Sequence, residues 1–189
     1  MAYTSINICS KALSKLGVEG ITSFEDGTAE SEIASSLYDL IKDGLLSSYP
    51  WSFATAQKRL SRLADAPIAD YKYSYHLPND YLRIISAGSG KKSLGLSYRI
   101  SGNKLCTNSS EVIITYIYKV YEEDLPPFFC DALTTKLASE FCLSLIDDTA
   151  KANYLVKKAE DEIKTARLID AQQSTPKKFE DFTLVEVRK

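Results

Sequence analysis

The chain has 189 residues, of which 44% are hydrophobic and 25% are charged, and its formal net charge is -2. These values are typical of a globular protein with one substantial core, so they exclude an unfolded chain. The near-neutral charge excludes a protein that binds nucleic acid through an overall basic surface.

Two amphipathic helices are predicted at the start of the chain. Thr4 or Ser5 can cap the first helix, and Gly17 is placed to end it. Thr28 can cap a second helix that reaches Ser48. The inward face of this second helix is predicted from apolar residues that recur every three or four positions: Ile33, Leu37, Leu40 or Ile41, and Leu45.

The second helix is expected to stop at Pro50. Proline lacks a backbone donor and pushes the preceding Tyr49 out of the α region. Trp51 and Phe53 follow at a spacing of two, which predicts both rings on one face of an extended segment. We expect these two rings to anchor the next strands to the helices.

An inserted antiparallel β region is predicted for residues 51–121, where apolar residues recur about every second position. The strand at 111–119 has apolar residues on both faces, so it is expected to be central and covered on both sides. A turn and the start of the next strand are predicted at Pro78, Asn79, Asp80 and Tyr81. One strand presents an aromatic face that consists of Tyr71, Tyr73, Tyr75 and Leu77.

Helical spacing resumes after the β region. A third helix is predicted from Leu125 to Leu145, with two prolines in its first turn. The acidic run 122–124 precedes it, and favourable charge near a helix N-terminus explains this run more simply than a metal site does. Residues 147–149 predict the cap of a fourth helix, whose inward stripe is rich in alanine: Ala152, Leu155 or Val156, Ala159, Ile163 and Ala166.

From Gln172 onward the helical pattern fails, and residues 173–189 are predicted to form an extended C-terminal tail. Its apolar residues alternate like those of a short strand that docks on the body or adds to a partner's sheet edge. A frayed end remains the alternative. The sequence therefore predicts an α+β protein with a four-helix bundle formed by residues 1–50 and 122–172, interrupted by the β region 51–121.

Catalytic and metal-binding patterns are missing from the sequence. The only histidine is His76, and the four cysteines are widely scattered without a CxxC pair, so we expect reduced, mostly buried thiols. We therefore predict no enzyme, no cofactor and no metal. The first residues do not form a signal peptide, and the longest apolar run, 112–118, is too short to span a bilayer. These features indicate a soluble protein made in a cytosol, with no membrane partner.

Most of the twelve tyrosines lie in or beside the β region. Together with nearby lysine and arginine residues they could form a stacking platform, which makes a single-stranded nucleic-acid-binding module one alternative function. Their alternation fits the interior of a sheet equally well.

Three stretches are familiar as motifs: Leu16-Gly17, Tyr49-Pro50-Trp51-Ser52-Phe53-Ala54, and Tyr75-His76-Leu77-Pro78-Asn79-Asp80-Tyr81-Leu82-Arg83. With the order of the predicted elements, they resemble the tail tubular protein A family, the head-to-tail adaptors of short-tailed bacteriophages. The resemblance implies a structural virion protein of the tail neck, assembled in the host cytoplasm. Such adaptors form a homo-oligomeric ring, typically of twelve copies, between the portal protein and the tail nozzle protein, and DNA passes through the lumen only as cargo.

The resemblance implies no catalytic residue. It implies that the C-terminal segment embraces the portal, through Phe179, Phe182, Leu184, Val185 and Val187. The residues of the motifs themselves are interpreted as structural anchors: Pro50, Trp51, Phe53, Pro78, Asp80 and Tyr81.

Overall fold

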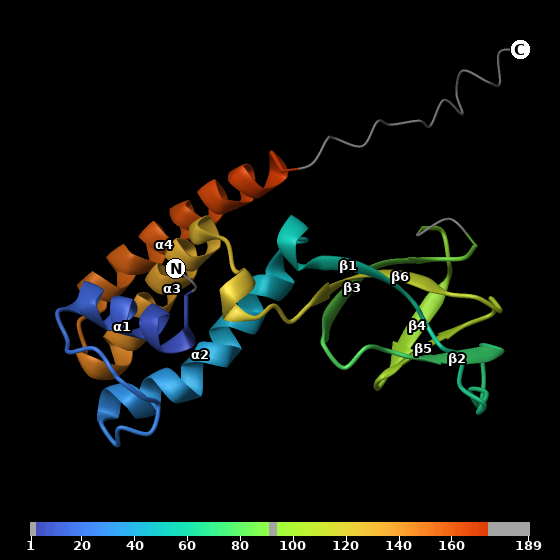
Figure 1. Cartoon of the computed structure of the whole chain (residues 1–189), viewed down its shortest axis with the longest axis horizontal. Coiled ribbons are helices and arrows are strands. Elements are labelled where there is room, and N and C mark those ends of the chain that lie inside the picture. The colour runs from blue at the N-terminus through green and yellow to red at the C-terminus, as the bar shows by residue number, and fades with distance from the viewer. Residues whose placement is uncertain (1–2, 91–93, 174–189) are drawn as a thin grey trace, which may run out of the picture.

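A computed structural model describes residues 3–90 and 94–173 of the chain (Figure 1). The described residues form an α+β protein, as predicted, with four α-helices at one end and six strands at the other (Figure 1). The polypeptide passes between the two ends twice, once after the second helix and once after the last strand. The β region is therefore inserted between the second and third helices, as predicted.

The first helix begins and ends where the sequence predicted. α1 (Ser5–Leu16) is capped by Thr4, whose Oγ1 accepts a hydrogen bond from the backbone N–H of Asn7 at 3.2 Å. The helix ends at Gly17, whose φ of 79° lies in the left-handed region that glycine adopts without steric cost.

The second helix also has the predicted bounds. α2 (Ala29–Ser48) begins at a capping box, in which the side chains of Thr28 and Ser31 each accept a hydrogen bond from the other's backbone N–H. It ends at Tyr49, which is extended because Pro50 follows it.

The predicted inward face of α2 is wrong by about one position. Leu40 is 70% exposed, and Ile33, Leu37 and Ile41 are only half-buried. One position along a helix corresponds to a rotation of about 100°. The helix is turned by this amount because it buries polar groups with distant partners as well as apolar ones; its buried residues are Ser31, Ala34, Tyr38, Lys42, Leu45 and Leu46.

The segment that carries Trp51 and Phe53 is not extended, which corrects the prediction. It forms a short 3-10 helix, η1 (Ser52–Ala54), before β1 (Thr55–Arg59) begins. The two rings still lie together, with centroids 5.8 Å apart, because the turn is held by the hydrogen bond from the N–H of Ala54 to the carbonyl oxygen of Trp51. Trp51 is fully buried in the helical core.

The β region consists of two three-stranded antiparallel sheets, with the orders β1-β6-β3 and β2-β5-β4. The two sheets pack face to face around a core of their own, separate from the helical core, and bury Leu60, Tyr75, Leu77, Ala87, Leu105, Val112, Ile114 and Tyr116. The remaining strands are β2 (Tyr73–His76), β3 (Tyr81–Gly88), β4 (Tyr98–Ser101), β5 (Lys104–Thr107) and β6 (Ile113–Tyr118).

β6 is the central strand of its sheet, as predicted. Its inner face, with Ile114 and Tyr116, is buried between the two sheets. On its outer face, Ile117 is buried in the helical core, whereas Ile113 and Thr115 are only half-buried. The expectation that both faces would be covered is therefore wrong for part of the strand, because the helices reach only the end near Ile117.

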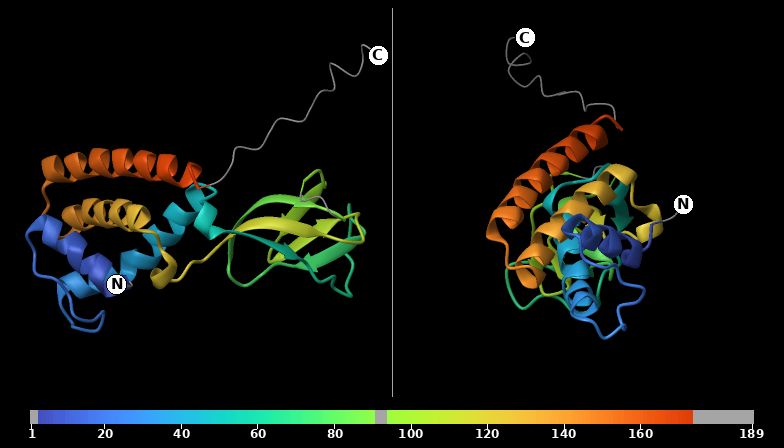
Figure 2. Two further views of the ribbon diagram at one scale, coloured as in Figure 1. Left: turned by 45° about the horizontal axis from the view of Figure 1, so that its top comes forward. Right: turned by 90° about the vertical axis from the view of Figure 1, so that its left-hand side faces the viewer.

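A second 3-10 helix, η2 (Glu122–Asp124), leads into α3 (Pro127–Leu145), which is followed by α4 (Thr149–Ala171). α3 lies in the middle of the helical part and packs against each of the other three helices (Figure 2). The alanine-rich stripe of α4 is buried as predicted, through Ala152, Leu155, Ala159 and Ala166. Small side chains allow α4 to lie close to α3.

The predicted tail, 173–189, lies outside the described residues except for Gln173. The same holds for the five residues that are predicted to bind the portal: Phe179, Phe182, Leu184, Val185 and Val187.

Candidate functional site

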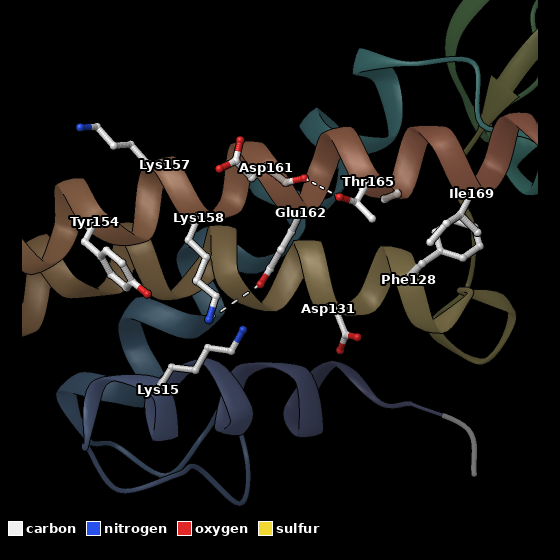
Figure 3. Close-up of a pocket in the computed structure, with 11 residues that line it drawn as sticks. Lys15, Phe128, Asp131, Tyr154, Lys157, Lys158, Asp161, Glu162, Thr165 and Ile169 are labelled. Carbon is white, nitrogen blue, oxygen red and sulfur yellow. Dashed lines mark hydrogen bonds and ion pairs between the residues drawn. The ribbon is translucent and has the colours of Figure 1, made fainter.

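A groove runs along one side of the helical part, between α1, α3 and α4 (Figure 3). Its volume is about 710 Å³. α4 forms its upper wall and α1 its lower wall, while α3 forms the floor between them (Figure 3). The lining residues are Lys15, Phe128, Asp131, Tyr154, Lys157, Lys158, Asp161, Glu162, Thr165, Ala166 and Ile169.

The walls of the groove combine apolar surface with charges of both signs. Lys158 and Glu162, one turn apart on α4, form an ion pair at 4.0 Å. Lys15 reaches from α1 and donates a hydrogen bond to the hydroxyl of Thr135. Burial lowers the pKa of Lys15 below its ordinary value of 10.5, although the nearby charge of Glu162 acts in the opposite direction. Tyr154 remains 64% exposed, so the groove is open to a further partner.

A second cluster of charged residues lies where the helical part meets the β region. Lys42 on α2 is only 3% exposed, and its Nζ lies 2.5 Å from Oε1 of Glu122 in η2. The hydroxyl of Tyr38 donates to the same oxygen at 3.3 Å. Just outside, Lys119 pairs with Asp43 of α2 at 3.0 Å. These pairs connect α2 to the segment that leaves the β region, so we name these five residues the junction network.

The junction network changes the pKa values of its members. Burial acts to raise the pKa of Glu122, but the hydrogen bond from Lys42 and the other favourable contacts outweigh it, so this pKa lies below its ordinary value of 4.5. The hydrogen bond to Asp43 raises the pKa of Lys119 above its ordinary 10.5. Burial, followed by the charge of Glu122, raises the pKa of Tyr38 well above its usual range.

Sequence reasoning missed the junction network. The acidic run was predicted to favour the N-terminus of the third helix, but Glu122 instead turns to Lys42, which lies 80 positions earlier in the chain. The available signal was a lysine one turn after Tyr38, on the side of α2 that the apolar spacing did not select. Such a signal identifies no partner by itself.

A third contact ties the end of α4 to the start of the β region. Asp170 is only 3% exposed, and its carboxylate accepts hydrogen bonds from the backbone N–H of Ser52 at 2.9 Å and from the Ser52 hydroxyl at 2.6 Å. The last turn of α4 is therefore fixed to the 3-10 turn that follows Trp51.

Replacing Asp170 with alanine is expected to lower the free energy of unfolding by about 1.5–3 kcal/mol, the usual effect of losing buried hydrogen bonds to a charged group. Denaturant unfolding of the two proteins measures this loss. Asp161, which is exposed on the same helix, provides the control, and its alanine variant should unfold like the original protein. Equal stability of both variants would contradict a role for Asp170 at this joint.

The predicted structural anchors lie on both connections between the two parts. Trp51 and Phe53 follow the first crossing, and their rings contact Phe129 of α3 at centroid distances of 5.2 Å each. The predicted turn at Pro78 and Asp80 lies beside the second crossing, where the carbonyl oxygen of Asp80 accepts a hydrogen bond from the N–H of Lys119 at 2.8 Å. Of the other anchors, Pro50 is exposed and Tyr81 is half-buried at the start of β3.

The predicted tyrosine face belongs largely to the interior of the β region. Tyr75 is 1% exposed and Tyr116 is 5% exposed, so neither ring is free to stack on a base. Tyr73, Tyr81, Tyr98 and Tyr118 are half-buried and pack against the same core. The strand with these rings thus uses its aromatic side for packing.

The residues with possible catalytic chemistry lie apart from one another. His76 is exposed beside Lys58 and Arg59 at a small hollow of about 170 Å³. All four cysteines are free and buried, as expected, and burial raises the pKa of Cys9 to about 12 and that of Cys130 to about 11. These thiols are therefore neutral packing groups.

Within residues 3–90 and 94–173, no group of three His, Cys, Asp or Glu side chains is placed to hold a metal ion. None of the helices in this part of the chain is long and apolar enough to cross a membrane.

Comparison with known proteins gives no match. No protein-family model fits the chain, and no curated protein matches it.

Proposed function

We propose that this chain is a head-to-tail adaptor of a short-tailed bacteriophage, a structural protein without an active site. In this proposal, copies of the chain form a ring, twelve in the family that it resembles. The ring joins the portal protein to the tail nozzle protein, and DNA passes through its lumen as cargo.

One observation carries the proposal: the molecule is an elongated body of two parts, each with its own core, fixed to each other at their junction (Figure 1). A connector between two protein rings must present separate surfaces at its two ends and hold them at a constant spacing. The junction network and the contact of Asp170 with Ser52 supply this fixed spacing. The order of elements agrees with the resemblance found in the sequence.

The charge of the chain is compatible with a DNA conduit. A formal net charge of -2 gives little electrostatic attraction to phosphate. Each additional phosphate contact would add affinity and salt-dependent drag to the moving genome. A weakly acidic ring avoids that drag.

The test is the native mass of a mixture of the purified chain with the portal ring of the same phage. The full-length protein is expected to add to the portal in a fixed ratio, whereas a version that ends at Gln173 is expected to add nothing, because it lacks Phe179, Phe182 and the apolar residues after them. Circular dichroism of the shortened protein should be unchanged in helix content, which shows that its described part still folds.

The outcome separates two claims. Binding of both versions would retain the adaptor function but contradict the role of the C-terminal segment. Binding of neither version would contradict the adaptor function itself, and the chain should then be tested against single-stranded oligonucleotides at two salt concentrations.

A further inference from the structure

The groove and the outer side of α2 lie on opposite faces of the helical part. The lining of the groove comes from α1, α3 and α4, with no residue of α2. α3 lies between α4 and α2 (Figure 2), and α2 passes behind α3, away from the groove, in Figure 3. The protein therefore carries a hollow on one side and a helix surface on the other.

The outer side of α2 presents a single large apolar side chain on an otherwise smooth surface. Leu40 is 70% exposed, the highest degree of exposure among the leucines in the described part of the chain. One turn before it stands Ser36, which is exposed, and one turn after it stands Gly44, where an added Cβ would meet no atom within 4 Å. The leucine therefore projects beyond its neighbours, and another helix can approach closely on either side of it.

The two faces differ in charge. α2 contains four acidic residues and one lysine, and this lysine, Lys42, is buried in the junction network. α1 contains two lysines and no acidic residue. α4 contains five basic and four acidic residues, and one of the acidic residues, Asp170, is buried at the joint. The surface beside the groove is thus basic, whereas the outer side of α2 is acidic, with Glu32 and Asp39 exposed.

We propose that the α2 face of one copy, centred on Leu40, docks into the groove between α1, α3 and α4 of a second copy. Leu40 enters between the apolar walls that Phe128 and Ile169 provide. Glu32 and Asp39 then lie toward Lys15 and Lys158 of the other copy. This inference rests on the proposed ring and adds which surfaces meet within it.

The arrangement of the two faces explains how a ring arises from this contact. A contact between two different surfaces is heterologous, and its repetition gives a closed ring when the rotation between copies divides a full turn. Each copy uses its α2 face once and its groove once, so no α2 face or groove is left unpaired in a closed ring. The strands take no part in this contact and remain free at the other end of the molecule.

The first test uses the Leu40→Lys variant, with Leu143→Lys as the matched control. Leu143 is 51% exposed on α3 and does not line the groove, so both changes add a positive charge at an exposed leucine. Leu40→Lys is expected to weaken association between copies by about tenfold or more, because it removes the apolar anchor and brings a cation toward the groove lysines. Native mass, with the portal ring and at high concentration without it, measures the association.

A second pair of variants tests whether the contact has two different sides. Lys158→Glu alters the groove but leaves the α2 face, whereas Leu40→Lys alters the α2 face but leaves the groove. Each variant alone is expected to associate weakly, whereas a mixture of the two should form heterodimers that cannot grow further. Association of the mixture no stronger than that of either variant overturns the inference.

Zero-length carbodiimide cross-linking of differently isotope-labelled copies identifies the contact directly. Cross-links between copies are expected to join Glu32 or Asp39 to Lys15 or Lys158. Copies that bind the portal without these cross-links would overturn the inference and leave the adaptor function standing. Failure to bind the portal would contradict the adaptor function, and the cross-links of the concentrated protein would then decide the inference separately; complete lack of self-association overturns it.

Discussion

The Trp51→Ala variant is expected to lose about 3–5 kcal/mol of the free energy of unfolding, the range for removing a large buried aromatic side chain. Trp51 is fully buried, and its ring centroid lies 5.0 Å from that of Tyr49 and 5.2 Å from that of Phe129. Its indole N–H donates to the carbonyl oxygen of Leu45 at 3.1 Å, which satisfies one of the unpaired acceptors at the end of α2. One side chain therefore joins two helices to the turn before β1.

The measurement is denaturant unfolding followed by circular dichroism, since this variant lacks the only tryptophan of the chain. Trp51→Phe serves as the second variant, because it keeps an aromatic ring but loses the hydrogen bond and part of the volume. Its expected loss is about 1–3 kcal/mol, which keeps the test informative even if the alanine variant does not fold. A loss below 1 kcal/mol for the alanine variant would contradict the anchoring role.

The helix ends could be predicted from the sequence because their causes are local. Thr28 and Gly17 act through hydrogen bonds within four residues, and Pro50 acts on its immediate neighbour. The central position of β6 was also predictable, since apolar residues on both sides of one strand indicate burial.

The features that hold the two parts together could not be predicted in the same way. The carboxylate of Asp170 and its partner Ser52 are 118 positions apart. The rotation of α2 that buries Lys42 depends on where Glu122 lies after the β region has folded. Periodicity ranks positions by hydrophobicity, so it selected Leu40 over a lysine, although tertiary contacts reversed this order. That reversal is what leaves an apolar side chain on the outer surface of α2.

The Glu122→Gln variant is expected to lose about 3 kcal/mol of the free energy of unfolding, because the ammonium group of Lys42 would then stay buried without its charged partner. Lys42 is 3% exposed, and its other ion pair, with Asp39, is longer at 3.7 Å. The double variant Lys42→Met with Glu122→Gln removes both charges and should recover most of the loss. If the double variant is as unstable as the single one, the cost lies in packing and not in the unpaired charge.

The pH dependence of this pair provides an independent measurement, with a sign set by the pKa of Glu122. This pKa is lower in the folded protein than its ordinary value of 4.5, so the folded state favours the carboxylate. The stabilisation from the pair is therefore fully present above about pH 4.5 and is lost as the pH falls through the folded pKa. The difference in unfolding free energy between the original protein and Glu122→Gln should accordingly stay constant from pH 7 to pH 5 and shrink below that range. A difference that persists unchanged into strong acid would mean that the Glu122 carboxylate does not stabilise the junction through its charge.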